Sequence, residues 1–156
     1  MANLCNSWAP MPLRLMLGGA FMYHGFPKLF DAAQHAGFEK QLASLKVPMP
    51  EIMAWVVGIV EFFGGAALIL GALVSLASLA LIVNMMFAMF KVHWPSGYAF
   101  VNVTGQNEAG QPIFGIPGFE VNLIFIAGLL ALLIGGAGRA SIDCMVGGKK
   151  KDAASP

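Results

Sequence analysis

Charge is scarce in this chain of 156 residues. Only 11% of the sequence is Asp, Glu, Lys or Arg, whereas 58% is hydrophobic, and the mean hydropathy is +0.73. Both values lie outside the range of soluble domains, so the composition excludes that class and indicates an integral membrane protein. The net charge of +1 is too small for a nucleic-acid-binding surface, and we predict no nucleic-acid partner. The length predicts a single domain.

Cysteine is equally sparse, with only Cys5 and Cys144 in the sequence. Their spacing matches no metal or redox motif, so we predict no metal site and favour two free thiols over a disulfide. The start of the sequence also lacks the basic segment and the small-residue cleavage site of a secretory signal. We therefore expect the first hydrophobic run to be a membrane-spanning helix.

Four hydrophobic runs predict an all-α, polytopic four-helix membrane bundle. The expected spans are residues 12–30, 52–71, 76–94 and 119–136 within a transmembrane domain of residues 1–148, and residues 149–156 are expected to be a disordered basic tail. Between the first two spans, Phe38, Leu42 and Leu45 recur at helical spacing among polar residues, which predicts an amphipathic helix lying in the membrane interface. Residues 95–118 are rich in Gly, Pro and Asn and predict a loop.

Glu61 is the only acid in the apolar run from Trp55 to Gly71. A carboxylate near the middle of a bilayer is costly unless it is protonated, paired or hydrated, and such a residue is by default a functional candidate. Gly58, Gly64 and other glycines of this run leave room for the backbone of a neighbouring helix.

Most other titratable residues are expected at the same end as Glu61. If the spans alternate, both termini lie at one end of the bundle (end A) and the opposite end (end B) begins about 14 Å from Glu61 and about 9 Å from His24. The residues expected near the surface of end B are Lys28, Lys91, His93, Trp94 and Glu120. Arg14 lies near end A, but it shares one side of its helix with His24 and Lys28, and we expect this side to face the interior of the bundle rather than lipid. We therefore predict a polar cavity open to end B.

Within this cavity we assign proton-transfer (catalytic) roles to His24, Glu61 and His93. The candidate ligand-binding residues are Arg14, Lys28, Lys91, Trp94 and Glu120. Simpler structural roles remain open for several of them. Lys28 and Lys91 can extend along the helix ends to reach the interface, Glu120 can stabilise a helix N-terminus, and Trp94 and His93 can be ordinary interfacial residues.

Several short motifs follow one another along the chain, namely Arg14, His24-Gly-X-X-Lys28, Gly58-X-X-Glu61-X-X-Gly64-Gly65, His93-X-X-X-Gly97 and Gly138-Arg-X-Ser141-X-Asp143. Their order and spacing resemble the DoxX family of four-helix membrane proteins. The resemblance implies a helical bundle in the cytoplasmic membrane of a bacterium or archaeon. Because some members are subunits of quinone-linked oxidoreductases, it also implies quinone or quinol as a cofactor and a partner redox subunit.

Two functions are therefore considered. In the first, a quinone-reactive subunit binds quinol through Lys28 or His93, stacks its ring on Trp94 or Phe26, and passes protons to His24 and Glu61. Because no motif for flavin, Fe–S or covalent haem is present, we expect a partner protein to carry the electron acceptor. A haem b held by His24 and His93 is a less favoured variant, because buried histidines have many other uses. In the second, the same cavity serves a non-catalytic carrier of a small molecule or ion, or an assembly scaffold.

Lipid contact is expected, and a homo-oligomer is conceivable. The basic tail favours cytoplasmic termini.

Overall fold

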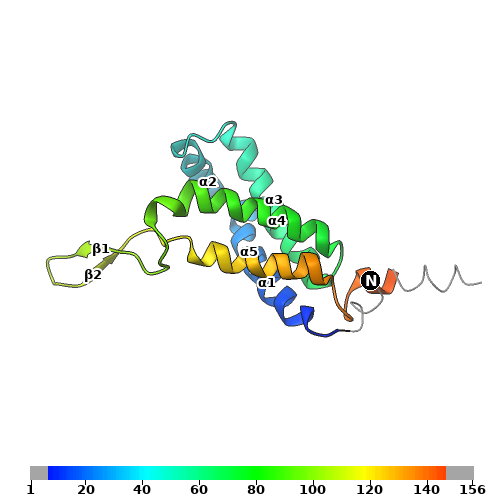
Figure 1. The fold of residues 1–156 in the computed structure, drawn as a ribbon. Helices are drawn as coiled ribbons and strands as arrows, with labels where there is room; N and C mark the ends of the chain where they lie inside the picture. The colour runs from blue at the N-terminus through cyan, green and yellow to red at the C-terminus, as the bar shows by residue number, and fades with distance from the viewer. Residues whose placement is uncertain (1–6, 147–156) are drawn as a thin grey trace, which may run out of the picture.

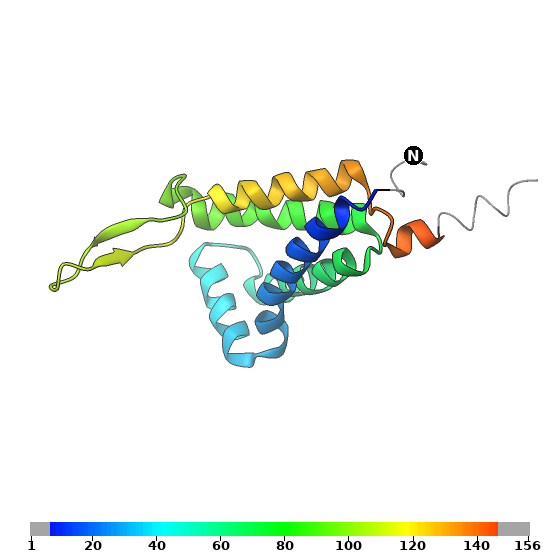
Figure 2. The same cartoon turned by 90° about the horizontal axis from the view of Figure 1, so that it is seen from below.

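The computed structural model describes residues 7–146, which form a body of packed helices with a β-hairpin projecting from one end (Figures 1 and 2). The helices are α1 (Pro10–Phe30), α2 (Ala32–Ser44), α3 (Pro50–Leu70), α4 (Val74–Ala88) and α5 (Glu120–Gly135). A π-helical turn (Met89–His93) and a 3₁₀ turn (Trp94–Ser96) extend α4, and the hairpin strands are β1 (Val103–Gln106) and β2 (Pro112–Phe114). Cys5 and the predicted tail 149–156 lie outside the described residues.

The sequence signals explain where the helices begin and end. Pro10 and Pro50 occupy the first turns of α1 and α3, where a missing N–H costs no hydrogen bond. Gly71 ends α3 in the left-handed conformation (φ 68°) that glycine adopts without strain. Asp31 caps α2 because its carboxylate accepts hydrogen bonds from Ala33 N and Gln34 N at 2.9 and 3.1 Å.

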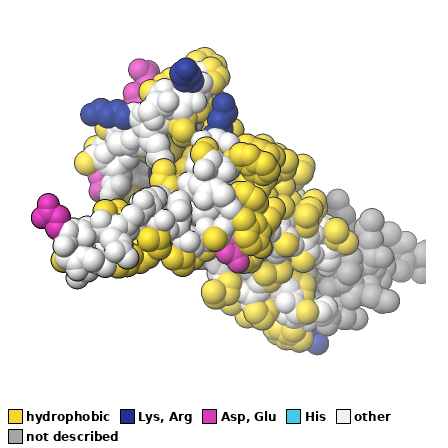
Figure 3. All heavy atoms as spheres, turned by 60° about the vertical axis from the view of Figure 1, so that its left-hand side comes forward, with side chains coloured by type: hydrophobic (Ala, Val, Ile, Leu, Met, Phe, Trp, Pro, Cys, Tyr) yellow, Lys and Arg dark blue, Asp and Glu magenta, His cyan; other side chains and the backbone are white. Residues whose placement is uncertain are grey.

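The four long helices α1, α3, α4 and α5 pack around an apolar core. Its members include Phe21, Leu68, Leu81 and Leu129, all at most 1% exposed, and the ring of Phe21 meets that of Phe125 edge-on at 5.5 Å. The outer surface is apolar as well, with hydrophobic side chains spread over the helices in the view of Figure 3. Such a surface suits contact with lipid.

Two helical segments are long and apolar enough to cross a membrane, namely Pro50–Leu70 and Val74–Ser96. The apolar helix α5 is shorter, with 16 residues. The predicted span 76–94 corresponds to α4 together with its π-helical and 3₁₀ extension, so the helix axis continues past Ala88 in a changed register.

The region expected to be a loop contains the β-hairpin, so the all-α prediction is wrong there. Val103 pairs with Phe114 and Gln106 with Pro112 in antiparallel register. Asn107 closes the turn, because its side-chain oxygen accepts hydrogen bonds from Ala109 N and Gln111 N. The hairpin extends away from the helices in both ribbon views (Figures 1 and 2).

The helix α2 forms where an amphipathic helix was predicted, but its apolar side does not face outward. Leu42 is 2% exposed and packs with Val47 and Ala54, with Phe38 and Leu45 beside them. Burial against the start of α3 removes these side chains from solvent and lipid alike. The helix α2 therefore covers part of the helical body at end B.

At end A, the segment after α5 folds back onto the helices, and Asp143 N donates to Gly71 O at 3.0 Å. Cys144 lies in this segment and is disulfide-bonded, so the prediction of free thiols is wrong for Cys144.

Candidate functional site

Glycines set a close contact between α1 and α3. A Cβ atom on Gly25 would lie 2.5 Å from the backbone nitrogen of Phe62 and 3.0 Å from Cβ of Glu61. A Cβ atom on Gly65 would lie 2.6 Å from the carbonyl oxygen of Gly18. Only glycine permits this separation of the two backbones, which brings the Lys28 side of α1 against the Glu61 side of α3.

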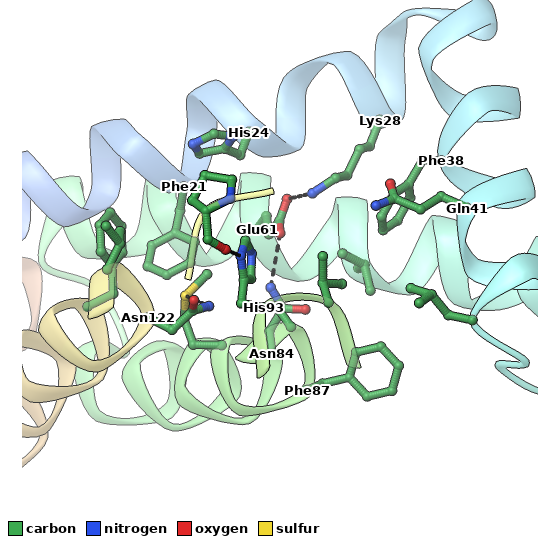
Figure 4. A pocket seen from close by; sticks show the side chains of 18 of the residues that line it. Phe21, His24, Lys28, Phe38, Gln41, Glu61, Asn84, Phe87, His93 and Asn122 are labelled. Atoms are coloured by element: carbon green, nitrogen blue, oxygen red, sulfur yellow. Dashed lines mark hydrogen bonds and ion pairs between the residues drawn. The ribbon is translucent and has the colours of Figure 1, made fainter. Parts of the chain in front are cut away.

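Glu61 is the centre of a buried polar cluster. Its side chain is 7% exposed, and one carboxylate oxygen forms an ion pair with Nζ of Lys28 while the other accepts a hydrogen bond from Nδ2 of Asn84 at 3.0 Å. Lys28 and Asn84 reach the carboxylate from α1 and α4 (Figure 4). The Lys28 ammonium also lies 4.7 Å from the centroid of the Phe38 ring of α2. These contacts offset the cost of burying the two charges.

This cluster lies in the wall of a cavity of about 400 Å³ toward end B. All the long helices, the helix α2 and the base of the hairpin contribute to the wall. Its polar residues are His24, Lys28, Gln41, Glu61, Asn84, His93 and Asn122, and its aromatic residues are Phe21, Phe38, Phe87, Phe100 and Phe125. A mainly apolar cavity with a few convergent polar groups is the usual form of a small-molecule site. The predicted polar cavity is therefore present, but most of its wall is apolar.

His93 faces this cavity from the π-helical turn. Its Nδ1 lies 2.8 Å from the carbonyl oxygen of Pro117. A carbonyl oxygen only accepts hydrogen bonds, so Nδ1 must carry the hydrogen, and in the neutral ring Nε2 is left as an acceptor. The π-helical turn and the segment before α5 thus orient the ring together.

His24 lines the cavity but is not deeply buried, contrary to the sequence-based expectation. Its side chain is exposed at the edge of the cavity and also borders a shallow crevice formed with Phe26, Pro27 and Phe62. Depth along a helix does not determine burial, because the helix face matters as well. His24 therefore marks the rim, whereas Glu61 is inside.

Four residues proposed as ligand contacts at end B lie outside the cavity. Lys91 is exposed, because it lies two positions before His93 and a helix turns by about 200° over that distance. Trp94 stacks on Phe119 with ring centroids 4.9 Å apart, and Glu120 accepts a hydrogen bond from Phe100 N at 3.1 Å. Phe26 packs against Phe30 and Phe62. Glu120 thus connects the hairpin base to α5, and Trp94 connects the extension of α4 to the start of α5.

Arg14 also lies outside the cavity, so its assignment as a ligand-binding residue is wrong. It is 2% exposed at end A, where Nη1 donates to Ala137 O and Nη2 donates to Ala140 O at 2.6 Å. The backbone carbonyls after α5 therefore bind both terminal nitrogens of its guanidinium group. The expectation that Arg14 faces the interior is confirmed.

A comparison with protein-family models gives a match to DoxX over residues 9–94, more than half of the chain. The chain belongs to the DoxX family. No curated protein and no solved structure matches it. DoxX membership, with the apolar helices and outer surface, identifies the chain as a membrane protein in contact with lipid. The match contains Lys28, Glu61, Asn84 and His93, whereas the hairpin and α5 lie beyond it.

Three polar residues of the cavity wall of this DoxX protein were not assigned to the site from the sequence, namely Gln41, Asn84 and Asn122. Asn84 bonds to Glu61, and Asn122 is 4% exposed with Nδ2 3.7 Å from Sδ of Met85. The sequence could have indicated that both asparagines face the interior, because each is an isolated amide in an apolar helix and such polar side chains generally face other helices. Gln41 is one of many polar residues on α2, so nothing in the sequence distinguishes it.

Proposed function

We propose that this DoxX protein is the membrane subunit of a quinone-linked oxidoreductase and that the cavity binds quinone or quinol. The supporting observation is the combination of one buried polar cluster, Lys28–Glu61–Asn84, with a wall rich in phenylalanine. A quinone head group is flat and has polar atoms on its ring edge, so it suits aromatic contacts together with a few hydrogen bonds.

Oxidation of a quinol to a quinone releases two protons and two electrons. Glu61 and His93 are placed in the cavity wall to exchange the protons, and His24 at the rim connects the cavity to its surroundings. The electrons require an acceptor, which we assign to a redox centre of a partner subunit. The bis-histidine haem stays a prediction. A dithionite-reduced minus oxidised spectrum tests it, because a haem signal in the wild type should be lost in both His24→Ala and His93→Ala.

We further propose that α1, α3, α4 with its extension, and α5 all cross the cytoplasmic membrane of a bacterium or archaeon. The helices α1 and α3 have 21 residues each, which is about 32 Å of helix. The 16 residues of α5 cover about 24 Å, a difference that local thinning of the bilayer accommodates.

The experiment measures quinone in lipid extracts of the protein purified in mild detergent, followed by titration of a short-chain ubiquinone into protein in nanodiscs. We expect stoichiometric quinone in the wild type and at least a tenfold weaker affinity in Glu61→Gln. Glu51→Gln is the matched control, because Glu51 is an exposed acid in the first turn of the same helix. Absence of quinone from the extract together with absence of binding in nanodiscs contradicts the proposal.

One observation favours an assembly scaffold as the second candidate. The strands of the hairpin are exposed along their whole length and carry Val103, Ile113 and Phe114, which are 52%, 47% and 66% exposed. An isolated two-stranded hairpin is marginally stable alone. If the hairpin serves assembly only, deleting residues 101–115 abolishes the complex with a partner subunit, while Glu61→Gln leaves that complex intact.

A further inference from the structure

Lys28 is the only primary amine in the cavity wall among the residues that the structure describes. The other lysines in that part of the chain, Lys40, Lys46 and Lys91, do not line the cavity. The side chain of Lys28 is 18% exposed, and within residues 7–146 its hydrogen-bond partner is the carboxylate of Glu61. An amine beside a carboxylate combines a nucleophile with a base, and here the pair borders a cavity (Figure 4).

The surroundings of this pair suit one positive charge beside one negative charge. Asn84 donates a hydrogen bond to the second oxygen of Glu61, and the Lys28 ammonium lies 4.7 Å from the centroid of the Phe38 ring, whose face attracts a cation. The rest of the wall is mainly apolar. Because Glu61 is buried, its carboxylate becomes costly once the cation is lost. A reaction that removes the charge of Lys28 is therefore disfavoured at this site.

We propose that Lys28 binds an apolar aldehyde covalently, as a protonated imine, with Glu61 as its base and counter-ion. Imine formation keeps the positive charge on the same nitrogen, whereas acylation of the amine gives a neutral amide and leaves Glu61 unpaired. The mainly apolar wall selects an aldehyde with a hydrocarbon or aromatic body, and it favours the product because hydrolysis of an imine needs water beside it. This activity is separate from quinone binding and does not depend on it.

The reaction balances without a further reagent. Glu61 takes one proton from the Lys28 ammonium, and the neutral nitrogen adds to the carbonyl carbon and forms a C–N bond. Glu61 gives its proton to the former carbonyl oxygen and takes a second proton from the nitrogen. Delivery of that proton to the hydroxyl group breaks the C–O bond, so water leaves and the nitrogen lone pair forms the C=N bond. The iminium carries one positive charge beside an ionised Glu61, as the ammonium did, and nothing is oxidised or reduced.

The test treats the wild-type protein in nanodiscs with 2-naphthaldehyde and sodium cyanoborohydride, which reduces an iminium to a stable amine. Peptide mass spectrometry measures the adduct on each lysine over time. We expect Lys28 to react about 100-fold faster than the exposed Lys40, because a neighbouring general acid–base group typically contributes this factor or more. Equal or slower reaction of Lys28 overturns the inference. It leaves the proposed function standing, because quinone binding is measured separately.

A charged aldehyde tests the class of ligand. 4-Formylbenzenesulfonate is an anion, which loses its hydration in an apolar cavity and meets the carboxylate of Glu61 there. Relative to Lys40, we expect Lys28 to react about tenfold more slowly with this anion than with 2-naphthaldehyde. If the two aldehydes give the same ratio of Lys28 to Lys40 labelling, the assignment of an apolar aldehyde is wrong.

Two substitutions test the roles of the pair. Lys28→Arg keeps a cation for Glu61 but has no primary amine, so it should abolish the adduct at this position, whereas Lys91→Arg at an exposed position should leave the Lys28 adduct unchanged. Glu61→Gln should slow labelling of Lys28 about 100-fold, with Glu51→Gln as the matched control.

Labelling of Lys28 at the wild-type rate in Glu61→Gln overturns the role of Glu61 as base. The comparison between Lys28 and Lys40 within the wild-type protein needs no variant, so it decides the inference even where Glu61→Gln does not fold.

Discussion

The helix α1 carries one inward-facing cation near each end, Arg14, which is buried, and Lys28, which is partly exposed, and the two differ in what they contact. Arg14 at end A donates to the backbone carbonyls of Ala137 and Ala140, whereas Lys28 at end B pairs with the Glu61 side chain beside a cavity. Both face the interior, as their common helix face predicts. A buried charge satisfied by backbone groups holds chain segments together, whereas one satisfied by side chains next to open space is available to a ligand.

An acid at each end, partly exposed Asp143 and buried Glu61, repeats this contrast. Asp143 at end A accepts hydrogen bonds from the backbone nitrogens of Leu73 and Val74 at 2.7 and 2.9 Å, at the start of α4. Glu61 at end B is held by Lys28 and Asn84, two side chains that can move without unfolding a helix. The charged side chains of end A thus bind backbone groups, whereas Glu61 at end B binds side chains in the wall of the cavity.

Substitution of Arg14 is expected to have the largest effect on stability. Arg14→Met leaves the buried carbonyl of Ala137 and the partly buried carbonyl of Ala140 without their charged donor, and we expect a loss of about 3–5 kcal/mol, measured by unfolding in mixed detergent micelles. Ligand affinity of the protein that remains folded should be unchanged, because Arg14 does not line the cavity.

Lys28→Met is the matched change at end B, on the same helix. Its side chain is 18% exposed, so we expect a smaller loss of stability and at least a tenfold loss of ligand affinity. The comparison between the two ends fails if Arg14→Met weakens binding more than Lys28→Met does.

The next largest effect is expected where α1 and α3 touch. Gly25→Ala places a methyl group against the backbone of Phe62, and separation of the helices should cost about 2 kcal/mol and pull Lys28 away from Glu61. Gly19→Ala, six residues earlier on the same helix, meets nothing within 4 Å and serves as the control. Thermal unfolding followed by tryptophan fluorescence, with ligand titration, measures both effects. Equal midpoints for the two variants argue against glycine-controlled packing.

The sequence alone distinguishes Glu61, because it is the single acid in an apolar run, and the structure buries this residue in the cavity wall. The sequence does not identify which of the cations at end B pairs with Glu61. Helical periodicity relates residues within one helix, but the partner of Glu61 depends on how α1 and α3 dock, and that depends on the glycines of both helices.

Lys91 and His93 show a second limit. They are close in sequence and were assigned to one site, yet only His93 faces the cavity. Its orientation depends on a π-helical turn, which no local sequence pattern predicts. The hairpin was missed for a similar reason. Its Gly, Pro and Asn residues are typical of loops, and the pairing of Val103 with Phe114 depends on the Asn107 turn between them.

A smaller effect is expected from Asp143→Asn, which tests end A with a nearly isosteric change. Asparagine has one acceptor oxygen where the carboxylate has two, so one of the two nitrogens at the start of α4 loses its bond. We expect a loss of about 1 kcal/mol with unchanged ligand affinity. Glu108→Gln, at an exposed position in the hairpin turn, should change neither.

The last prediction concerns the compartment that each end faces. The basic tail predicts a cytoplasmic end A, but Cys144 of end A is disulfide-bonded, and structural disulfides persist in oxidising compartments outside the cytoplasm. The disulfide places an oxidised cysteine at end A, whereas the basic residues are divided between both ends of the molecule and favour neither strongly. We therefore expect end A to face outward, which would open the cavity toward the cytoplasm.

In intact spheroplasts, a membrane-impermeant maleimide should label Cys144 only after treatment with an impermeant reductant. Labelling that requires lysis of the cells would place end A inside and direct proton exchange by Glu61 and His93 to the outer face. Either result assigns a direction to the protons released from a quinol, because the cavity wall lies toward end B whichever way the protein is inserted.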